Sequence, residues 1–305
     1  MGVCESNNFS PNILRINEEI KELTMNNSIK YSNHEKLKHN YKLISKVSEG
    51  AFGRIFIGLG KTGKNYAIKC LLKKKILSKE SLLNEIEIGI KVNHPNILKI
   101  KEIYESKTKI SLVMEYCESG DLFDFIKNSS QGKLNDINTI EIIIQILDAL
   151  NYLHNEVKIC HRDLKPENCL IKINEQRKPI IKLIDFGIAK FIDINNKMTG
   201  KIGSIKYMAP EIFIRPFYNE KIDIWSAGII LYNMATGRDA FSLETKEFNN
   251  PKIINKNINF NIIKNEEIRE LCKELLEKNP NKRINASSAF EKAKTIKKKL
   301  IGFNE

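Results

Sequence analysis

The chain reads HRDLKPEN over residues 161–168 and IDFG over residues 184–187. Asp163 and Asn168 therefore stand with four residues between them, and Asp185 follows after a short hydrophobic interval. An aspartate in such a loop can orient a hydroxyl, while an asparagine and a second aspartate can hold metal ions over a triphosphate. The spacing indicates phosphoryl-transfer chemistry.

The composition is that of a globular protein with an excess of positive charge. The chain has 305 residues, 42% of them hydrophobic, which suffices for two lobes or two small domains. The net charge of +13 is spread along the chain, with lysine clusters at residues 73–75 and 297–299 inside amphipathic stretches. No basic motif interleaved with aromatic residues is found, so we interpret this charge as solvated surface and expect no nucleic-acid partner.

The cysteines form no pair with metal-ligand or disulfide spacing, which disfavours both kinds of site. A cytoplasmic, reducing compartment is expected, and the sequence shows neither a secretory leader nor an apolar run of membrane-spanning length. The six cysteines are Cys4, Cys70, Cys117, Cys160, Cys169 and Cys272.

The first residues, MGVCES, fit the pattern for N-myristoylation of Gly2. Such a short pattern also occurs by chance, but Cys4 favours lipidation because one acyl chain binds a membrane only marginally and a thioester-linked chain is the usual second signal. The sequence therefore predicts membrane association through acylation of Gly2 and Cys4.

Residues 11–23 have the pattern of a short amphipathic helix that begins at Ser10 and Pro11. Its polar face is acidic, which favours packing on the following domain over lying on a membrane. The polar stretch 24–40 reads as a linker, so residues 1–40 are interpreted as an N-terminal extension. The apolar positions of the helix are Ile13, Ile16, Ile20 and Leu23.

A β-rich region begins near Tyr41 and contains SEGAFG at residues 48–53. Glycines there let the backbone approach a phosphate closely and point its N–H groups at it. A turn at Thr62 and Gly63 and the strand YAIK at residues 66–69 follow. Strand residues rather than a helix follow Gly53, which argues against a dinucleotide-binding fold.

With these motifs in this order, the sequence resembles the eukaryotic protein kinases over residues 41–293. One position departs, because Ser48 stands where the family's pattern has its first glycine. The resemblance implies an α+β, bilobal protein kinase fold: a β-rich N-lobe with one main helix (41–114), a hinge (115–120) and a larger helical C-lobe (121–293). Residues 294–305 would form a short basic tail.

The resemblance implies an ATP site built largely from the N-lobe and hinge. Met114 would guard the back pocket, and adenine would bind backbone groups of Glu115 and Cys117. Asp121 is interpreted equally as a ribose contact or as an ordinary acid at a helix N-terminus. The implied nucleotide-binding residues are Val47, Ser48, Glu49, Gly50, Ala51, Phe52, Gly53, Arg54, Ile55, Ala67, Lys69, Glu85, Met114, Glu115, Cys117, Asp121, Leu170 and Asp185.

Residues 79–92 are predicted to form the main N-lobe helix, and by resemblance Glu85 pairs with Lys69. Glu87 competes for this role, but it lies about 200° around the helix from Glu85 and is interpreted as solvated. A lysine beside a carboxylate keeps its charge and position, so Lys69 could hold the α- and β-phosphates.

In the catalytic loop, the resemblance makes Asp163 the base that accepts the proton of the substrate hydroxyl. Lys165 would stabilise the transferring phosphoryl group, and it also marks the family's serine/threonine branch. Asn168 and Asp185 would hold Mg²⁺. Leu170 would form the floor of the adenine pocket.

The activation segment would run over residues 185–211, with the hydroxyl of Ser204 contacting the catalytic aspartate. Gly200 occupies the usual position of an activating phosphate, so Thr199 is the nearest site for one to pair with Arg162. The favoured alternative is a segment that needs no phosphate and is held by packing of Ile202, Ile205 and Tyr207. By resemblance, Asp223 belongs to a buried anchor helix and Arg283 pairs with Glu211.

The sequence thus predicts an ATP- and Mg²⁺-dependent serine/threonine protein kinase that acts as a monomer on protein substrates in intracellular signalling. HPNI at residues 94–97 and NKMT at 196–199 resemble calcium-dependent protein kinases. No EF-hand loop is present, so no direct calcium site is expected. The alternative is a membrane-tethered pseudokinase, against which the complete set of Lys69, Glu85, Asp163, Asn168 and Asp185 argues.

Overall fold

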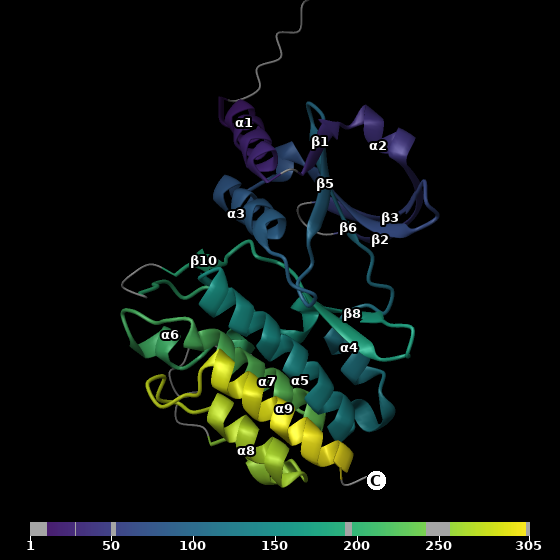
Figure 1. Cartoon of the computed structure of the whole chain (residues 1–305). Helices are drawn as coiled ribbons and strands as arrows, with labels where there is room; N and C mark the ends of the chain where they lie inside the picture. Colours follow the sequence, from purple (N-terminus) through teal and green to yellow (C-terminus); the bar gives the residue numbers. More distant parts are fainter. Residues whose placement is uncertain (1–10, 28, 50–52, 193–196, 242–256, 303–305) are drawn as a thin grey trace, which may run out of the picture. The chain divides into compact units, whose positions relative to one another are not determined.

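The computed structural model describes residues 11–27, 29–49, 53–192, 197–241 and 257–302 (Figure 1). They belong to two compact units. The first takes in residues up to Val92 and Leu98–Tyr116, and the second takes in Asn93–Ile97 and the chain from Cys117 onward. The first is rich in strands and the second is mostly helical, which confirms the expected α+β class with two lobes.

The first unit is built on a six-stranded sheet in the order β1-β5-β6-β4-β3-β2. All neighbouring strands are antiparallel except β1 and β5, which are parallel. The strands are β1 (Lys30–Asn33), β2 (Tyr41–Glu49), β3 (Gly53–Gly60), β4 (Asn65–Leu72), β5 (Ile100–Glu105) and β6 (Lys109–Glu115).

The stretch 24–40 is more ordered than the linker that its polar composition predicts. It contains β1 and the helix α2 (Glu35–Asn40), and Leu37 of α2 is buried. As an edge strand, β1 needs backbone hydrogen bonds on one side only, so its side chains can stay polar. One of them, Lys30, forms an ion pair with Glu102 of β5 at 3.1 Å. Pairing with a distant strand is therefore what orders this segment, and local composition does not show it.

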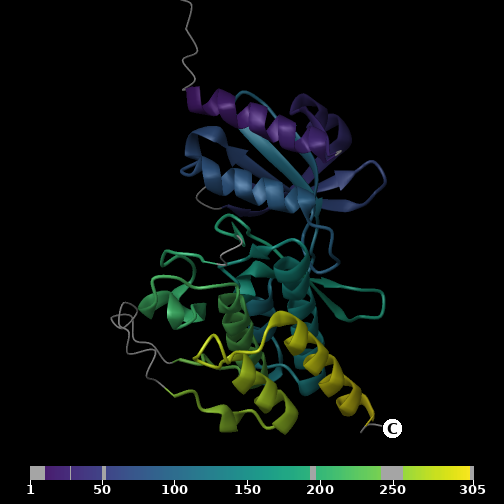
Figure 2. The ribbon, with the colours of Figure 1, turned by 60° about the vertical axis from the view of Figure 1, so that its left-hand side comes forward.

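Two helices belong to the same unit: α1 (Pro11–Asn26) and α3 (Lys79–Lys91), the latter preceded by the short helix η1 (Lys73–Lys75). The side chain of Ser78 caps α3 by accepting a hydrogen bond from the backbone of Ser81. α1 lies along α3 (Figures 1 and 2). The helix predicted from Pro11 onward is thus present and packs within the unit, as expected.

Helix α7 of the second unit is apolar on every side and buried over nearly its whole length. Helix α5 packs on α7 and α9, and α8 packs on the same two helices. The helices are α4 (Leu122–Lys127), α5 (Asp136–Asn151), α6 (Glu211–Ile214), α7 (Lys221–Thr236), α8 (Glu266–Leu275) and α9 (Ala286–Gly302), with the short turns η2 (Ser130–Gly132), η3 (Tyr152–Glu156), η4 (Pro166–Asn168), η5 (Ile205–Tyr207) and η7 (Phe260–Ile262).

Two small antiparallel ribbons position the loops of this unit. β8 (Cys169–Ile173) pairs with β9 (Pro179–Leu183), and β7 (Ile159–Cys160) pairs with β10 (Lys190–Phe191). Residues 161–168 connect β7 to β8, and residues 184–189 connect β9 to β10. Each of the two sequence stretches that indicate phosphoryl transfer therefore connects one ribbon to the other. Among the described helices, none is both long enough and apolar enough to cross a bilayer.

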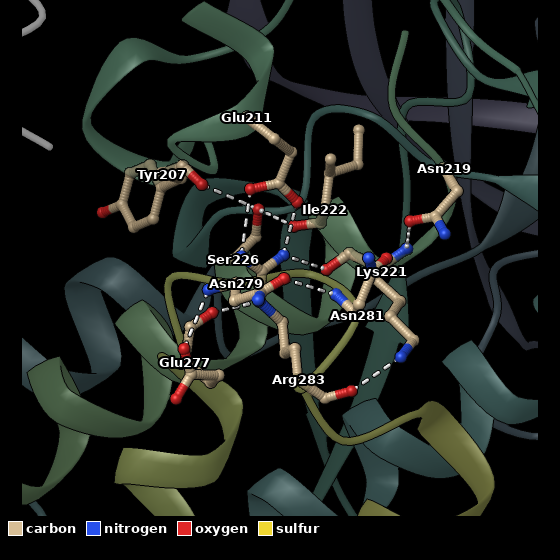
Figure 3. Close-up of polar contacts among 10 residues, drawn as sticks. All are labelled: Tyr207, Glu211, Asn219, Lys221, Ile222, Ser226, Glu277, Asn279, Asn281 and Arg283. Carbon is tan, nitrogen blue, oxygen red and sulfur yellow. Dashed lines mark hydrogen bonds and ion pairs between the residues drawn. The ribbon is translucent and has the colours of Figure 1, made fainter. Parts of the chain in front are cut away.

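A buried ion pair ties the end of the activation segment to the loop before α9 (Figure 3). Arg283 donates from both terminal nitrogens to Glu211, over 2.6 and 3.0 Å, and both side chains are at most 1% exposed. The guanidinium also donates to the backbone carbonyls of Glu277 and Lys221, and Lys221 Nζ donates to the carbonyl of Arg283. Such a pair tolerates burial because each polar group has partners.

Replacing Arg283 with alanine should leave the Glu211 carboxylate buried without its cation. We expect a loss of about 3–5 kcal/mol in the free energy of unfolding, measured by urea titration. Lys292→Ala is the matched control, because it removes an exposed pair with Glu274 and should leave that free energy nearly unchanged. Equal, small effects of the two variants would contradict the structural role of the buried pair.

Candidate active site

Asp223 of α7 holds the start of the loop at residues 161–168 through hydrogen bonds to its backbone. One carboxylate oxygen, Oδ2, accepts the backbone N–H of His161 at 2.8 Å, and the other accepts that of Arg162 at 2.9 Å. His154 Nε2 lies 2.8 Å from Oδ2. Burial raises the pKa of Asp223, but the hydrogen bond and charge of His154 outweigh it, and the pKa is lowered overall. The carboxylate therefore stays ionised and holds the loop.

Three residues of the predicted catalytic machinery surround Asp163. Lys165 Nζ lies 2.7 Å from Asp163 Oδ2 and 2.9 Å from Ser204 Oγ. Asn168 donates its amide to the backbone carbonyl of Asp163 at 2.8 Å and to Oδ2 at 3.2 Å. The arrangement is a half-buried carboxylate held in place by three donors.

Ser204 differs in detail from its expected role. Its hydroxyl accepts a hydrogen bond from Lys165, and it is the backbone N–H of Ser204 that donates to Asp163 Oδ1, at 2.8 Å. A backbone donor can serve this purpose for any residue, so the sequence could not show which atom makes the contact. Both contacts bring the activation segment to the catalytic loop.

Asn168 and Asp185 offer oxygen atoms of the kind that Mg²⁺ prefers. The described hydrogen bonds of the Asn168 side chain use its NH₂ group, which leaves Oδ1 able to face a cation. Asp185 is exposed, has a φ of 69°, and follows Ile184, whose N–H donates to the carbonyl of Asn168 at 3.0 Å. One carboxylate and one amide suffice where substrate phosphates and water complete the coordination; the residues fit this ion.

In the first unit, Lys69 and Glu85 form an ion pair. Lys69 on β4 lies 2.6 Å from Glu85 Oε1 on α3, and each side chain is about a quarter exposed or less. Glu87 instead pairs with Lys91, one helical turn later, at 2.6 Å. Lys69 and Glu85 thus form the pair that the resemblance implies, while Glu87 has a different partner.

The hairpin of β2 and β3 carries Val47, Ser48, Glu49, Arg54 and Ile55. Val47 is 51% exposed, and Ile55 stands opposite Lys69 in the sheet. Glu49 accepts hydrogen bonds from Lys46 and Arg54, which lower its pKa to about 2. This pairing closes the hairpin next to its tip. The tip residues Gly50, Ala51 and Phe52 lie outside the described residues.

Gly53 has a packing reason to be glycine. A Cβ at this position would stand 2.1 Å from the backbone carbonyl oxygen of Cys70 on β4. No side chain fits in that space without moving backbone. The close approach of β3 to β4 therefore requires this glycine, besides any role that it has toward a phosphate.

The remaining nucleotide-binding candidates divide between the units. Met114 is buried on β6 opposite Ala67, and Glu115 ends that strand. In the second unit, Cys117 is buried and Leu170 forms a bridge with Asp121. Asp121 caps α4, because its Oδ1 accepts the backbone N–H of Asp124 at 2.9 Å. Asp121 therefore acts as the N-terminal cap of α4, and its contact with ribose stays a prediction.

The activation segment is held by polar contacts that its sequence does not predict. Arg162 Nη2 donates to the carbonyl oxygen of Thr199 at 2.9 Å and to the hydroxyl of Tyr218 at 2.7 Å. That hydroxyl is also within hydrogen-bond distance of the carbonyls of Thr199 and Gly200. Met198 and Tyr218 exchange two backbone hydrogen bonds. Nothing in the spacing of Tyr218 from Arg162 could have revealed this clamp.

The expected packing is correct only in part. Tyr207 is buried, but Ile202 is 40% exposed and Ile205 is only partly buried. The apolar residues of the segment predicted that packing would hold it. Its backbone carbonyls instead make the contacts to Arg162 and Tyr218, and a sequence does not show which carbonyls will be used. The described polar contacts of residues 198–200 are thus made by their backbone groups with Arg162 and Tyr218.

Comparison with known proteins agrees with this geometry. The family model described as the protein kinase domain matches residues 41–293. The chain belongs to the protein kinase family.

This kinase domain is similar to calcium-dependent protein kinase 4 of Plasmodium falciparum, with 36% identity over 252 residues, 79% of this chain and 47% of the relative. It is 34% identical to calcium-dependent protein kinase 19 of Arabidopsis thaliana over 266 residues, 84% of this chain and 48% of the relative. The likeness predicted from residues 94–97 and 196–199 is confirmed.

An Aurora kinase of Candida glabrata is 30% identical over 288 residues, 93% of this chain and 76% of the relative. The chain spans about half the length of the calcium-dependent kinases that it matches.

Proposed function

We propose that the chain transfers the γ-phosphate of ATP to serine and threonine hydroxyls of protein substrates. The observation that carries this proposal is the cluster of Lys165, Asn168 and Ser204 around the Asp163 carboxylate. A half-buried carboxylate with fixed orientation can accept a proton from a hydroxyl that comes within hydrogen-bond distance. The complete set of catalytic residues argues against a nucleotide-binding scaffold without activity.

The cluster assigns a task to each side chain. Ser204 and Asn168 hold Asp163 so that the remaining lone pairs of its carboxylate are available to the acceptor hydroxyl. Lys165 carries a positive charge next to this position, where negative charge develops on the transferring phosphoryl oxygens. Positioning and charge stabilisation of this kind supply most of the rate in phosphoryl transfer.

Magnesium is the metal that the donor set suits, and we place it at Asn168 and Asp185. When bound, it would neutralise charge on the phosphates of ATP. Lys69 would hold the α- and β-phosphates, since the carboxylate of Glu85 fixes its ammonium group. The hairpin residues 47–55, Ala67, Met114, Glu115, Cys117, Asp121 and Leu170 are proposed as the remaining nucleotide contacts.

A role in signalling and an anchor at the membrane are further parts of the proposal. Gly2 and Cys4 precede the described residues, and their sequence pattern alone supports acylation.

Asp163→Asn and Lys69→Met should each lower the rate of peptide phosphorylation by a factor of about 10²–10⁴, because each removes a proton acceptor or a fixed charge. Thermal unfolding should stay close to that of the unmodified protein. Lys91→Met is the matched control for Lys69→Met, since it removes an exposed helix pair with Glu87. Full turnover in the Asp163 variant would show that another group is the base.

Dephosphorylated protein should keep substantial activity, because Arg162 already binds the carbonyl of Thr199 and the hydroxyl of Tyr218. We expect Thr199→Ala to change the turnover number less than about threefold, since the contact is made by the backbone of Thr199. A phosphatase-treated sample that regains activity only when Thr199 is phosphorylated would overturn this expectation.

Peptide arrays should show phosphorylation of serine and threonine, with a mild preference for basic residues N-terminal to the acceptor. Glu167 and Asp121 supply the negative charge for this preference, and Asn233, where related kinases place a further glutamate, makes it mild. Phosphorylated tyrosine, or a preference for acidic peptides, would be incompatible with the proposed substrate class.

Protein carrying acyl groups on Gly2 and Cys4 should partition to membranes, and Gly2→Ala should release it into the soluble fraction. Mass spectrometry of the protein from its native cell reports the modification directly. An unmodified Gly2 would remove the anchor from the proposal.

A further inference from the structure

Helix α1 precedes the residues that match the kinase family, yet it packs on the helix that carries Glu85. α1 and α3 lie side by side in both views (Figures 1 and 2). Glu85 of α3 must reach β4 to pair with Lys69. Whatever fixes the position of α3 therefore also affects the lysine that is proposed to hold the nucleotide.

Two apolar side chains of α1 are buried. Ile16 and Ile20 are 5% and 1% exposed. They are four residues apart and so lie on the same face of the helix. Met25, further along α1, is 67% exposed and lies away from this face. The helix thus has one buried face and one open face.

Polar contacts of α1 hold the chain at both ends of the connection between β4 and α3. Glu19 Oε1 lies 2.8 Å from Lys79 Nζ, at the first residue of α3. Asn17 Oδ1 accepts a hydrogen bond of 2.8 Å from Lys73, in η1. The segment that leads from the nucleotide lysine strand into α3 is therefore bound to α1 at two points, six residues apart.

Lys73 is the centre of a buried ionic junction, although the lysine run 73–75 predicts a solvated position. Its side chain is 2% exposed and pairs with Glu105 at the end of β5, while Lys74 and Lys75 are exposed. Burial lowers the pKa of Lys73 to about 8 and raises the pKa of Glu105 to about 7. A buried ammonium needs all its partners, and Asn17 is the partner that comes from α1.

We infer that α1 is a positioning element for the ion pair between Lys69 and Glu85. Its buried face and its contacts to Lys73 and Lys79 hold α3 where the Glu85 carboxylate reaches Lys69. This inference rests on the proposed kinase function and extends it: Asn17, Glu19 and Ile20 act on phosphate binding through α3 and touch no substrate. Helix α1 therefore contributes to the proposed nucleotide site by holding α3 in place.

The test uses the 305-residue chain with Ile20→Ser, which places a hydroxyl in the buried face of α1. We expect kcat/KM for ATP to fall roughly tenfold. Met25→Ser, on the open face of the same helix, is the matched control and should change kcat/KM less than about twofold. No loss with Ile20→Ser would overturn the inference.

A second background separates positioning from general destabilisation. In Glu85→Gln protein the pair with Lys69 is already weakened, so Ile20→Ser should cause little further loss, again less than about twofold. Asn17→Ala should show the same non-additive pattern. An equal fold loss in both backgrounds would mean that α1 acts on stability alone and would overturn the inference.

Calorimetry gives the dissociation constant of MgATP for four proteins: the unmodified chain, Ile20→Ser, Glu85→Gln and the double variant. This measurement keeps the test separate from the proposed catalysis. If the unmodified chain binds MgATP but phosphorylates no peptide, the proposed catalysis fails while the inference is still decided by binding. Weaker binding caused by Ile20→Ser only when Glu85 is present supports α1 as the positioning element. Unchanged binding in all four proteins would overturn it.

Discussion

The catalytic half of the molecule depends on one buried negative charge. Asp223 is 1% exposed, so its ionisation is tolerated only because His154 and two backbone N–H groups of the catalytic loop satisfy it. Arg162, whose N–H is one of these two groups, has a left-handed backbone conformation with a φ of 68°. That conformation directs Arg162 toward the activation segment and leaves Asp163 facing Ser204. One electrostatic requirement thus sets the geometry of two functional groups.

Each of the two units contains a buried ion pair whose charged groups have further hydrogen-bond partners. Arg283 with Glu211 and Lys73 with Glu105 are buried pairs supported by further hydrogen bonds. Buried pairs add little net stability compared with apolar packing, but leaving one partner alone is costly. Such pairs therefore specify position, which suits segments whose displacement would disturb a catalytic group.

Much of the site could be predicted from sequence because its residues follow fixed spacings within single loops or helices. The family resemblance selected Glu85, helix geometry set Glu87 on another face, and the loop at 161–168 needs only local sequence. Tyr218 and Lys73 could not be predicted in this way. The first contacts Arg162 and two backbone carbonyls through the tertiary fold. The second is buried and donates a hydrogen bond to Asn17, on a helix that precedes the residues matched by the kinase family. The strand β1 was missed for the same reason, since its partner β5 lies about 70 residues away.

The pair of Glu211 and Arg283 also has a consequence for synthesis of the chain. The guanidinium is made 72 residues after the carboxylate that it binds, which takes about 4–14 s at the usual rate of about 5–20 residues per second. During that interval the nascent polypeptide holds a glutamate that its native surroundings cannot yet enclose. The end of the activation segment can therefore reach its final place only after the codons as far as Arg283 have been read.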